Sequence, residues 1–315
     1  MKSSGTLFTA ILALSLVGAL SAESINPPTM PQTAPMNKQE KKNLDMVLEW
    51  WRVVIQGGHL DQAPKYQAED YIQHNPNVNT GRAGFVEFFS KFSKPKDPIP
   101  ATLDNPPVVM GAKGDFVWLI FEQEQKVPGD ALKTYHYDSF EVIRIQNGKV
   151  QEHWDSAMKM AGSGNINTGV SPKPPSEWNT GKLNKGEEMT LALATEELKD
   201  MLQYGHLELA DKTMDPGYIQ HNPNVPQGRD GFKAFMSRRP GQPREIKPEW
   251  PNPPVLTLVD GPYSVMMWDR KAKDPDDPNK MYTWNHYDVV RMENGHIKEH
   301  WDEARIIVLP ASRDK

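Results

Sequence analysis

The sequence predicts an α+β protein built from two tandem copies of one domain, and two observations carry this prediction. First, the segment Tyr71–Arg82, YIQHNPNVNTGR, recurs as Tyr218–Arg229, YIQHNPNVPQGR, with 10 identities in 12 positions at an offset of 147. Second, a helical pattern comes before a run of strand patterns in each copy. Helices followed by consecutive strands are typical of an α+β domain.

The offset of 147 holds without a gap over most of each copy. It pairs Asn105–Val108 with Asn252–Val255, and it pairs Glu152–Asp155 with Glu299–Asp302. A long constant offset indicates a duplicated domain rather than a solenoid of short repeats.

Each copy opens with apolar residues at helical spacing. The positions are Leu44, Val47, Leu48, Trp51, Val54 and Ile55 in the first copy, and Leu191, Ala194, Leu198, Met201 and Leu202 in the second. We expect each helix to end near a glycine, Gly58 or Gly205, because glycine is the usual C-terminal cap. The YIQHNP segment should be a loop, since Pro76 and Pro223 disfavour helix before them, and Gly-Arg-x-Gly-Phe should open a second, short helix.

The second part of each copy reads as strands. Residues 116–121 form an apolar run, and residues 135–145 and 149–154 flank Asn147-Gly148. Asn-Gly between apolar runs predicts a two-residue hairpin, because both residues tolerate positive φ. Residues 263–268 and the later Asn-Gly repeat this pattern, so we expect a meander of antiparallel strands wrapped over the helices.

The chain divides into five expected segments. Residues 1–22 contain one lysine, then an uncharged apolar run of about 14 residues, and then small residues. This order is typical of a secretory signal peptide. The apolar run is shorter than the roughly 20 residues that a membrane-spanning helix needs. A retained anchor is the alternative. Residues 23–37 read as a flexible leader, 38–160 as the first domain, 161–184 as a Gly-, Pro-, Ser- and Asn-rich linker, and 185–310 as the second domain.

Composition excludes several kinds of chemistry. The 315 residues contain no cysteine, which rules out disulfides, thiolate metal sites and a cysteine nucleophile. The net charge is −5, so nucleic acid is not an expected partner. No nucleophile elbow, phosphate-binding P-loop or dinucleotide fingerprint occurs, and we expect no cofactor.

Four positions in each copy carry candidate catalytic side chains. They are His74, Glu141, His153 and Asp155 in the first copy, and His221, Asp288, His300 and Asp302 in the second. A lone loop histidine, such as His74, is either structural or catalytic. Glu141 is a desolvated acid or base, a solvated charge on an edge strand, or the partner of Arg144 in an ion pair.

Strand alternation groups these residues by face. His153 and Asp155 should project to one face, and Glu152 and Trp154 to the other. The histidine and aspartate form either an acid–base pair or a structural hydrogen bond. A metal could use these types together with His74, yet no closed ligand set with diagnostic spacing is present, so we expect no metal.

Each copy resembles the SnoaL-like branch of the nuclear transport factor 2-like (NTF2-like) superfamily. The resemblance rests on Tyr71–Pro76, on Gly81–Phe85, and on Arg144-x-x-Asn-Gly-x-x-x-Glu-His-Trp-Asp ending at Asp155. It implies two tandem cone-shaped domains, each a curved antiparallel sheet wrapped over N-terminal helices and enclosing an apolar pocket. It also implies that the two copies pair through their sheets as an intramolecular pseudo-dimer, with further oligomerisation left open.

By this resemblance the catalytic candidates line the pockets together with further side chains. These are Tyr71, Tyr135, Tyr137, Tyr218, Tyr282, Trp284 and His286. The second copy keeps the aspartate that is usual in the family, Asp288, whereas the first copy has Glu141. Since one methylene can misplace a base, we expect the second pocket to be the active one.

The resemblance implies a cofactor-independent acid–base enzyme of the aldol-cyclase, isomerase or lyase type, acting on a small hydrophobic carbonyl compound. The alternatives are a non-catalytic module that binds a small molecule in the same pocket, and a structural assembly protein. The signal peptide predicts export, periplasmic or secreted, with no membrane association after cleavage.

Overall fold

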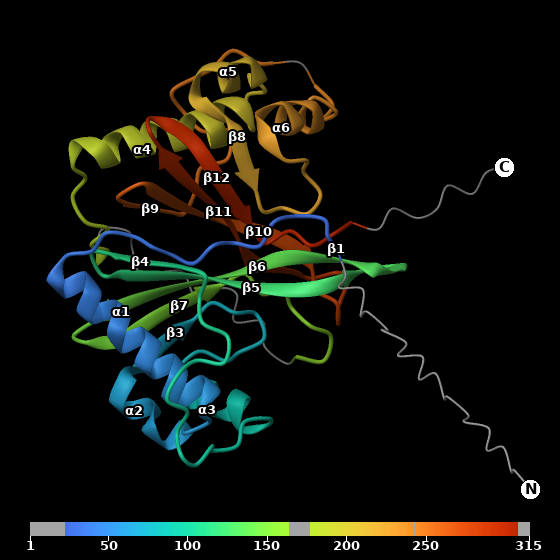
Figure 1. The fold of residues 1–315 in the computed structure, drawn as a ribbon. Helices are drawn as coiled ribbons and strands as arrows, with labels where there is room; N and C mark the ends of the chain where they lie inside the picture. Colours follow the sequence, from blue (N-terminus) through green and yellow to red (C-terminus); the bar gives the residue numbers. More distant parts are fainter. Residues whose placement is uncertain (1–22, 164–176, 242, 308–315) are drawn as a thin grey trace, which may run out of the picture.

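The computed structural model describes residues 23–163, 177–241 and 243–307, so the expected signal peptide, residues 1–22, lies outside the described residues. Two similar halves stack with their sheets in the middle and their helices on the two outer sides (Figure 1). Each half joins a few helices to one sheet, which confirms the α+β class and the tandem arrangement. None of the described helices is both long and apolar enough to cross a membrane.

The elements of the two halves follow the same order. The first half contains α1 (Lys38–Trp50), η1 (Trp51–Gln56), η2 (Leu60–Gln62), α2 (Ala63–Tyr66), β3 (Gln67–Gln73), α3 (Arg82–Ser90), β4 (Val109–Lys113), β5 (Phe116–Val127), β6 (Asp130–Gln146) and β7 (Lys149–Asp155). The second contains α4 (Lys185–Thr195), η4 (Glu196–Met201), η5 (Leu207–Leu209), α5 (Ala210–Thr213), β8 (Met214–Gln220), α6 (Gly228–Met236), β9 (Leu256–Asp260), β10 (Tyr263–Lys273), β11 (Met281–Glu293) and β12 (His296–Asp302).

The first helix of each half starts and ends for local reasons. Asn37 and Asn184 cap α1 and α4 through a capping box, in which the side chain accepts from the backbone while a glutamate three residues on returns the contact. Each helix then widens into a π-helical turn, η1 or η4, before a glycine with positive φ, Gly58 or Gly205. The glycine ends confirm the expected boundaries.

The hairpins follow the Asn-Gly signals. Asn147 and Gly148 have φ of 53° and 71°, and Asn294 and Gly295 have φ of 50° and 76°. Positive φ at both positions fits a type I′ turn. The hairpins fix the register of β6 with β7 and of β11 with β12, and these strands carry the predicted site residues.

One expectation about the sheet is wrong. The segment beginning YIQ is not wholly a loop, because residues up to Gln73 and Gln220 form the last part of β3 and β8. These two strands pair in parallel with β7 and β12, at the edge of each sheet, whereas the main strands β4–β7 and β9–β12 are antiparallel. The loop starts only at His74 and His221.

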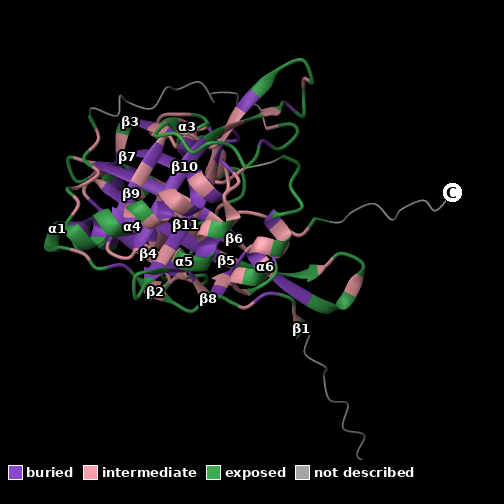
Figure 2. Ribbon diagram, turned by 90° about the horizontal axis from the view of Figure 1, so that it is seen from above, coloured by how far each residue is buried: buried purple, intermediate pink, exposed green. Residues whose placement is uncertain are grey.

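The two sheets face each other and share one core. Strands of both halves contribute its buried apolar side chains, among them Trp154 and Trp301. The rings of Phe140 and Tyr287 stack across the contact at 5.3 Å. Buried residues run along the strands of both sheets (Figure 2). The halves are therefore paired through their sheets within one chain, and the outer sheet faces remain for the helices to cover.

The leader of residues 23–37 is ordered, contrary to the expectation that it is flexible. Its strand β1 (Glu23–Ser24) pairs with β6 and its strand β2 (Gln32–Thr33) pairs with β4. Between them, Asn26 donates to the carbonyl oxygen of His221, and Thr29 contacts both the His221 ring and the Trp301 indole. The leader thus ties the first sheet to the second half.

The expected linker, residues 161–184, is described in part. Trp178 packs at right angles against Phe116 and Trp154, with ring centroids 5.6 Å away in each case. Its packing places the end of the linker against the edge of the shared core. Residues 164–176 lie outside the described residues.

Candidate active site

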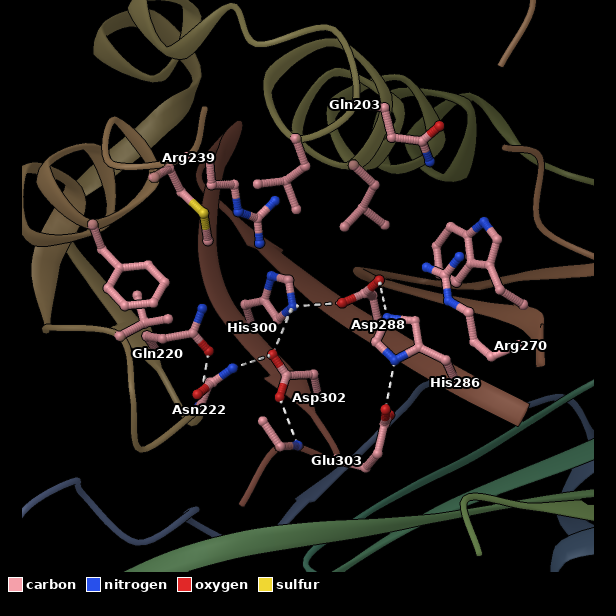
Figure 3. Close-up of a pocket in the computed structure, with 17 residues that line it drawn as sticks. Gln203, Gln220, Asn222, Arg239, Arg270, His286, Asp288, His300, Asp302 and Glu303 are labelled. Carbon is pink, nitrogen blue, oxygen red and sulfur yellow. Dashed lines mark hydrogen bonds and ion pairs between the residues drawn. The ribbon is translucent and has the colours of Figure 1, made fainter. Parts of the chain in front are cut away.

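A cavity of about 280 Å³ lies in the second half, between the outer face of its sheet and the helical segments η4 and α6 (Figure 3). Its apolar wall consists of Leu198, Leu202, Val225, Phe235, Met236 and Trp268. Ten of its 17 lining residues are polar or charged. The pocket is therefore more polar than the apolar pocket that the resemblance implied.

Strand alternation places the candidate residues in this cavity. Asp288 on β11 is directly opposite Asp302 on β12, and His300 is two residues before Asp302. Directly opposed and i, i+2 residues project to the same face of a sheet. All three line the pocket, while Trp301 between them points into the shared core.

His300 is held between two carboxylates. Its Nδ1 lies 2.8 Å from Glu197 Oε1, and its Nε2 lies 3.0 Å from Asp288 Oδ1. Tyr218 also donates its hydroxyl to Glu197. Because a carboxylate faces each ring nitrogen, both nitrogens carry a hydrogen and the ring is an imidazolium. Its Nε2–H is directed toward Asp288, as Figure 3 shows.

At this site, the neighbouring charges affect the pKa values of His300 and Asp288 more strongly than burial does. Burial alone would lower the pKa of His300, but Glu197 and Asp288 outweigh it and raise this pKa well above its ordinary value. Burial would likewise raise the pKa of Asp288, but His286 and His300 outweigh it and hold this pKa below its ordinary value. At neutral pH the site thus contains an ionised aspartate beside a protonated histidine.

A second histidine completes the charged set. His286 lies on the same strand face as Asp288, with Nε2 3.2 Å from Asp288 Oδ2, and its Nδ1 pairs with Glu303. Burial would lower the pKa of His286, but Asp288 and Glu303 raise it to about 10. Asp302 accepts from the Asn222 side chain and from the backbone of Ala304, so its carboxylate is fixed in place.

The matching positions of the first half contain a neutral histidine instead of an imidazolium. His153 Nε2 lies 2.6 Å from Glu141 Oε2, and its Nδ1 contacts the Tyr71 hydroxyl and the Gln73 amide. Burial lowers the pKa of His153 to about 4, against the nearby charge of Asp155. Burial also raises the pKa of Glu141 well above its ordinary value and that of Asp155 to about 6. The histidine is neutral at pH 7.

Two substitutions between the copies explain this difference. Glu197 corresponds at the offset of 147 to Trp50, whose ring packs 5.9 Å from the His153 ring, so no carboxylate faces His153 Nδ1. The pocket residue Leu198 corresponds to Trp51, which stacks on Phe121 at 5.0 Å. Two indole rings therefore stand at the positions where the second half has the carboxylate that faces His300 and a leucine that lines the cavity.

His74 and His221 are not pocket residues, contrary to expectation. Each stacks on the inner-face tryptophan, Trp154 at 4.5 Å or Trp301 at 4.9 Å. Each also pairs with the inner-face glutamate of the same half; His221 Nε2 lies 2.8 Å from Glu299 Oε1. The loop leaves the parallel edge strand toward the shared core, so these histidines support the contact between the halves.

Most of the aromatic candidates also lie outside the pocket. Four of them, Tyr135, Tyr137, Tyr282 and Trp284, share the strand face of the site. Those of the second half, Tyr282 and Trp284, are not among the residues that line its cavity. Tyr71 and Tyr218 lie behind the histidines and contact the groups that hold them. Of this set, only His286 lines the cavity of the second half.

Four charged residues of the site were missed by the sequence analysis: Glu197, Glu303, Arg239 and Arg270. At the offset of 147 their counterparts are Trp50, Ser156, Phe92 and Gln123, so each charge occurs in the second copy alone. Charge that differs between otherwise matching copies was the signal that could have found them.

Two groups of side chains have donor types that suit a divalent cation: Asp288, His300 and Asp302, and their counterparts in the first half. A metal would require His300 Nε2 to be deprotonated. The flanking carboxylates favour the protonated ring, and His286 adds a positive charge beside Asp288. A proton on His300 Nε2 and a divalent cation at this trio are therefore alternatives.

Comparison with known proteins gives one family match, covering both halves. The model described as SnoaL-like domain matches residues 47–153 and 195–300. No match was found among curated proteins.

Solved structures with a similar fold each correspond to one half of the chain. A protein assigned as a polyketide cyclase from Acidithiobacillus ferrooxidans is 20% identical, with 38% of this chain and 89% of that one covered and a TM-score of 0.27. An NTF2-like protein from Burkholderia xenovorans LB400 is 19% identical, with 37% of this chain and 88% of that one covered and a TM-score of 0.26. An LEH-like epoxide hydrolase from M. tuberculosis is 12% identical, with 38% of this chain and 81% of that one covered and a TM-score of 0.27.

Proposed function

Because the chain belongs to the SnoaL-like family, we propose that its second half is a cofactor-independent acid–base enzyme of the aldol-cyclase, isomerase or lyase type, acting on a small carbonyl compound. One observation carries the proposal: His300 is fixed between Glu197 and Asp288 at the wall of a cavity. A positioned acid and a positioned base together are what proton transfer next to a carbonyl group requires.

We propose a role for each group. Asp288 takes the proton from the carbon next to the carbonyl group, and His300 donates its Nε2 proton to the carbonyl oxygen, which gives an enol. The enol either attacks a second carbonyl group, as in an aldol closure, or regains a proton at another carbon, as in an isomerisation. Glu197 touches neither reacting atom; it keeps His300 protonated and fixes the direction of Nε2.

The low pKa of Asp288 has a consequence for this mechanism. An aspartate held ionised by two imidazoliums is a weak base in the free protein. When a ligand replaces water in the cavity and takes the proton of His300, one of these positive neighbours is neutralised, and the basicity of Asp288 rises. Acid and base are thereby coupled, since the step that uses one activates the other.

Exchange of carbon-bound hydrogen tests the proposal without knowledge of the final product. Acetophenone and related small ketones are incubated with the protein in D₂O, and loss of the hydrogens next to the carbonyl group is followed by NMR. We expect Asp288→Asn and His300→Gln each to lower the exchange rate about 10²-fold or more. The matched changes in the first half, Glu141→Gln and His153→Gln, should leave the rate unchanged.

The alternative is a module that binds a small molecule without converting it. It would be favoured if small ketones bind to the second half but exchange no faster than in buffer. His221→Ala is a further control, because this residue lies on the inner face. It should reduce stability but not the exchange rate per folded molecule. We also propose that the protein acts after export, on the basis of residues 1–22.

A further inference from the structure

Two arginines of the second-half pocket have side chains without a partner among the residues that the structure describes. Arg239 and Arg270 both line the cavity, and neither guanidinium forms a hydrogen bond or an ion pair with any residue that the structure describes. Three other arginines of the same half are paired: Arg291 with Glu299, Arg229 with Asp211, and Arg244 with the carbonyl oxygen of Gln203. Among the described residues, the exposed Arg238 is also without a side-chain partner, but it does not line the cavity. Both guanidiniums belong to side chains that line the cavity.

The arginines approach the cavity from different walls. Arg270 lies on β10, two residues beyond Trp268, so it shares the pocket face of the sheet. Arg239 follows the end of α6 and is exposed at the rim. In Figure 3, Arg239 extends from the helical side toward His300, and Arg270 lies beyond Asp288 and His286. Both arginines therefore line the same cavity as Asp288.

Among the described residues, no carboxylate of the pocket forms an ion pair with these arginines, and each carboxylate has other partners. Asp288 is engaged by His286 and His300. Glu303 is engaged by His286 and by the backbone of Tyr287, and the Asp302 carboxylate is held from the backbone and a side chain. Two positive groups therefore remain available to an anion from outside.

The first half offers a comparison within the same chain. At the offset of 147, Arg239 corresponds to Phe92 and Arg270 to Gln123. The first half has neither arginine, and the half with the cavity has both. The two halves share one fold, but the two arginines occur only in the half that has the cavity.

We propose that the ligand of the second-half pocket is an organic anion, a carbonyl compound that bears a carboxylate, and that Arg239 and Arg270 bind this carboxylate. Planar guanidinium groups match the geometry of a carboxylate and bind it through paired hydrogen bonds. The cavity of about 280 Å³ suits a molecule with a single ring. This inference rests on the proposed function and specifies its substrate class.

The test compares an acid with its neutral ester. Binding of 3-benzoylpropionate and of its methyl ester is measured by calorimetry, in the wild type and in Asp288→Asn. We expect the acid to bind at least tenfold more tightly than the ester in both proteins, and this preference to weaken as salt is added. Equal binding of acid and ester, or no binding of either at millimolar concentration, overturns the proposal.

Variants that install the first-half residues localise the effect. Arg239→Phe and Arg270→Gln should each weaken binding of the acid about tenfold and leave the ester unchanged. The control is Arg238→Gln, an exposed neighbour that does not line the cavity; it should change neither ligand's binding. If both ligands weaken together in the two pocket variants, the arginines shape the pocket without binding the carboxylate, and the proposal is wrong.

These experiments distinguish failure of the anion-site proposal from failure of the proposed enzyme activity. Selective binding of the acid without exchange of its carbon-bound hydrogens would support an anion site and contradict the enzyme. Equal exchange rates for acid and ester, both lost in Asp288→Asn, would support the enzyme and contradict the anion site. Phenylpropylphosphonate serves as a third ligand; if it binds more tightly than 3-benzoylpropionate, the site is specific for a different oxyanion and the carboxylate assignment fails.

Discussion

The charge of Glu197 distinguishes the second site from the first, and Glu197→Gln tests what it does. Glutamine has nearly the same shape and keeps an oxygen that can accept from His300 Nδ1 and from Tyr218. The substitution therefore removes a buried negative charge 2.8 Å from the imidazolium and little else. We expect the pKa of His300 to fall and the protein to lose stability.

The size of the loss follows from the geometry. At an effective dielectric constant of about 20, two unit charges 2.8 Å apart attract each other by about 6 kcal/mol before desolvation is subtracted. Breaking a buried pair costs about 3–5 kcal/mol in practice. Since glutamine retains a hydrogen bond worth about 1 kcal/mol, we expect a decrease of about 2–4 kcal/mol in the free energy of unfolding at neutral pH.

The pH dependence of this loss of stability is a sharper test than its magnitude. The pKa of His300 is raised in the folded state, so its contribution to stability is complete below the ordinary histidine pKa and is lost as the pH rises through the folded pKa. In Glu197→Gln the folded pKa is lower, so the loss begins at lower pH. The gap in stability between wild type and variant should be complete at and below the ordinary histidine pKa of about 6.5 and should close under alkaline conditions.

Chemical denaturation at a series of pH values, with NMR titration of the His300 ring, measures both effects. The control is Glu299→Gln, a buried carboxylate on the inner face that pairs with His221 and Arg291. It should cost stability without changing the titration of His300. A stability gap that is the same at every pH, or a His300 ring that titrates alike in wild type and Glu197→Gln, would refute the electrostatic account.

Four further outcomes are expected. Leu198→Trp should fill the cavity and abolish binding of 3-benzoylpropionate in calorimetry, at a cost of about 1–3 kcal/mol in denaturation; retained binding would contradict it. Thr29→Val should cost about 1–3 kcal/mol in denaturation, because it leaves His221 without this partner; an unchanged midpoint would mean that the leader is not held there. Burial raises the pKa of Asp260 to about 7, although Trp118 donates a hydrogen bond to it. The free energy of unfolding should therefore decrease as the pH rises from about 4 to about 7, and this decrease should be smaller in Asp260→Asn. A decrease of equal size in the variant would rule out Asp260 as its source. Chelation with EDTA should leave ketone exchange unchanged, and a lost rate restored by a divalent cation would reverse the assignment.

The sequence was informative wherever short-range rules decide the structure. Alternation along a strand placed His300 and Asp302 on one face and Trp301 on the other, as the structure shows. The Asn-Gly dipeptides fixed the hairpins in the same way. These features depend on neighbours in the chain and on the stereochemistry of single residues, so they can be read without knowledge of the tertiary fold.

Long-range packing decided the features that were missed or misplaced. The repeated hexapeptide made His221 a candidate, yet the side on which its ring lies depends on the parallel pairing of β8 with β12. The role of Glu197 depends on how a π-helical turn meets the sheet, and in the sequence it is one acid in a charged helix. Such contacts between distant segments have no signature in local periodicity.

Fusion of the two copies accounts for the asymmetry of their sites. In a symmetric dimer each subunit has the same sequence, so a change that fills one pocket fills both. In a single chain the outer faces can differ, and Trp50 stands where the other half has Glu197. The inner faces cannot diverge as freely, because Trp154 and Trp301 are buried in one shared core. A half that lacks the carboxylate of Glu197 still supplies its sheet to that core, so the chemistry can reside in the second half while the first is kept for its fold.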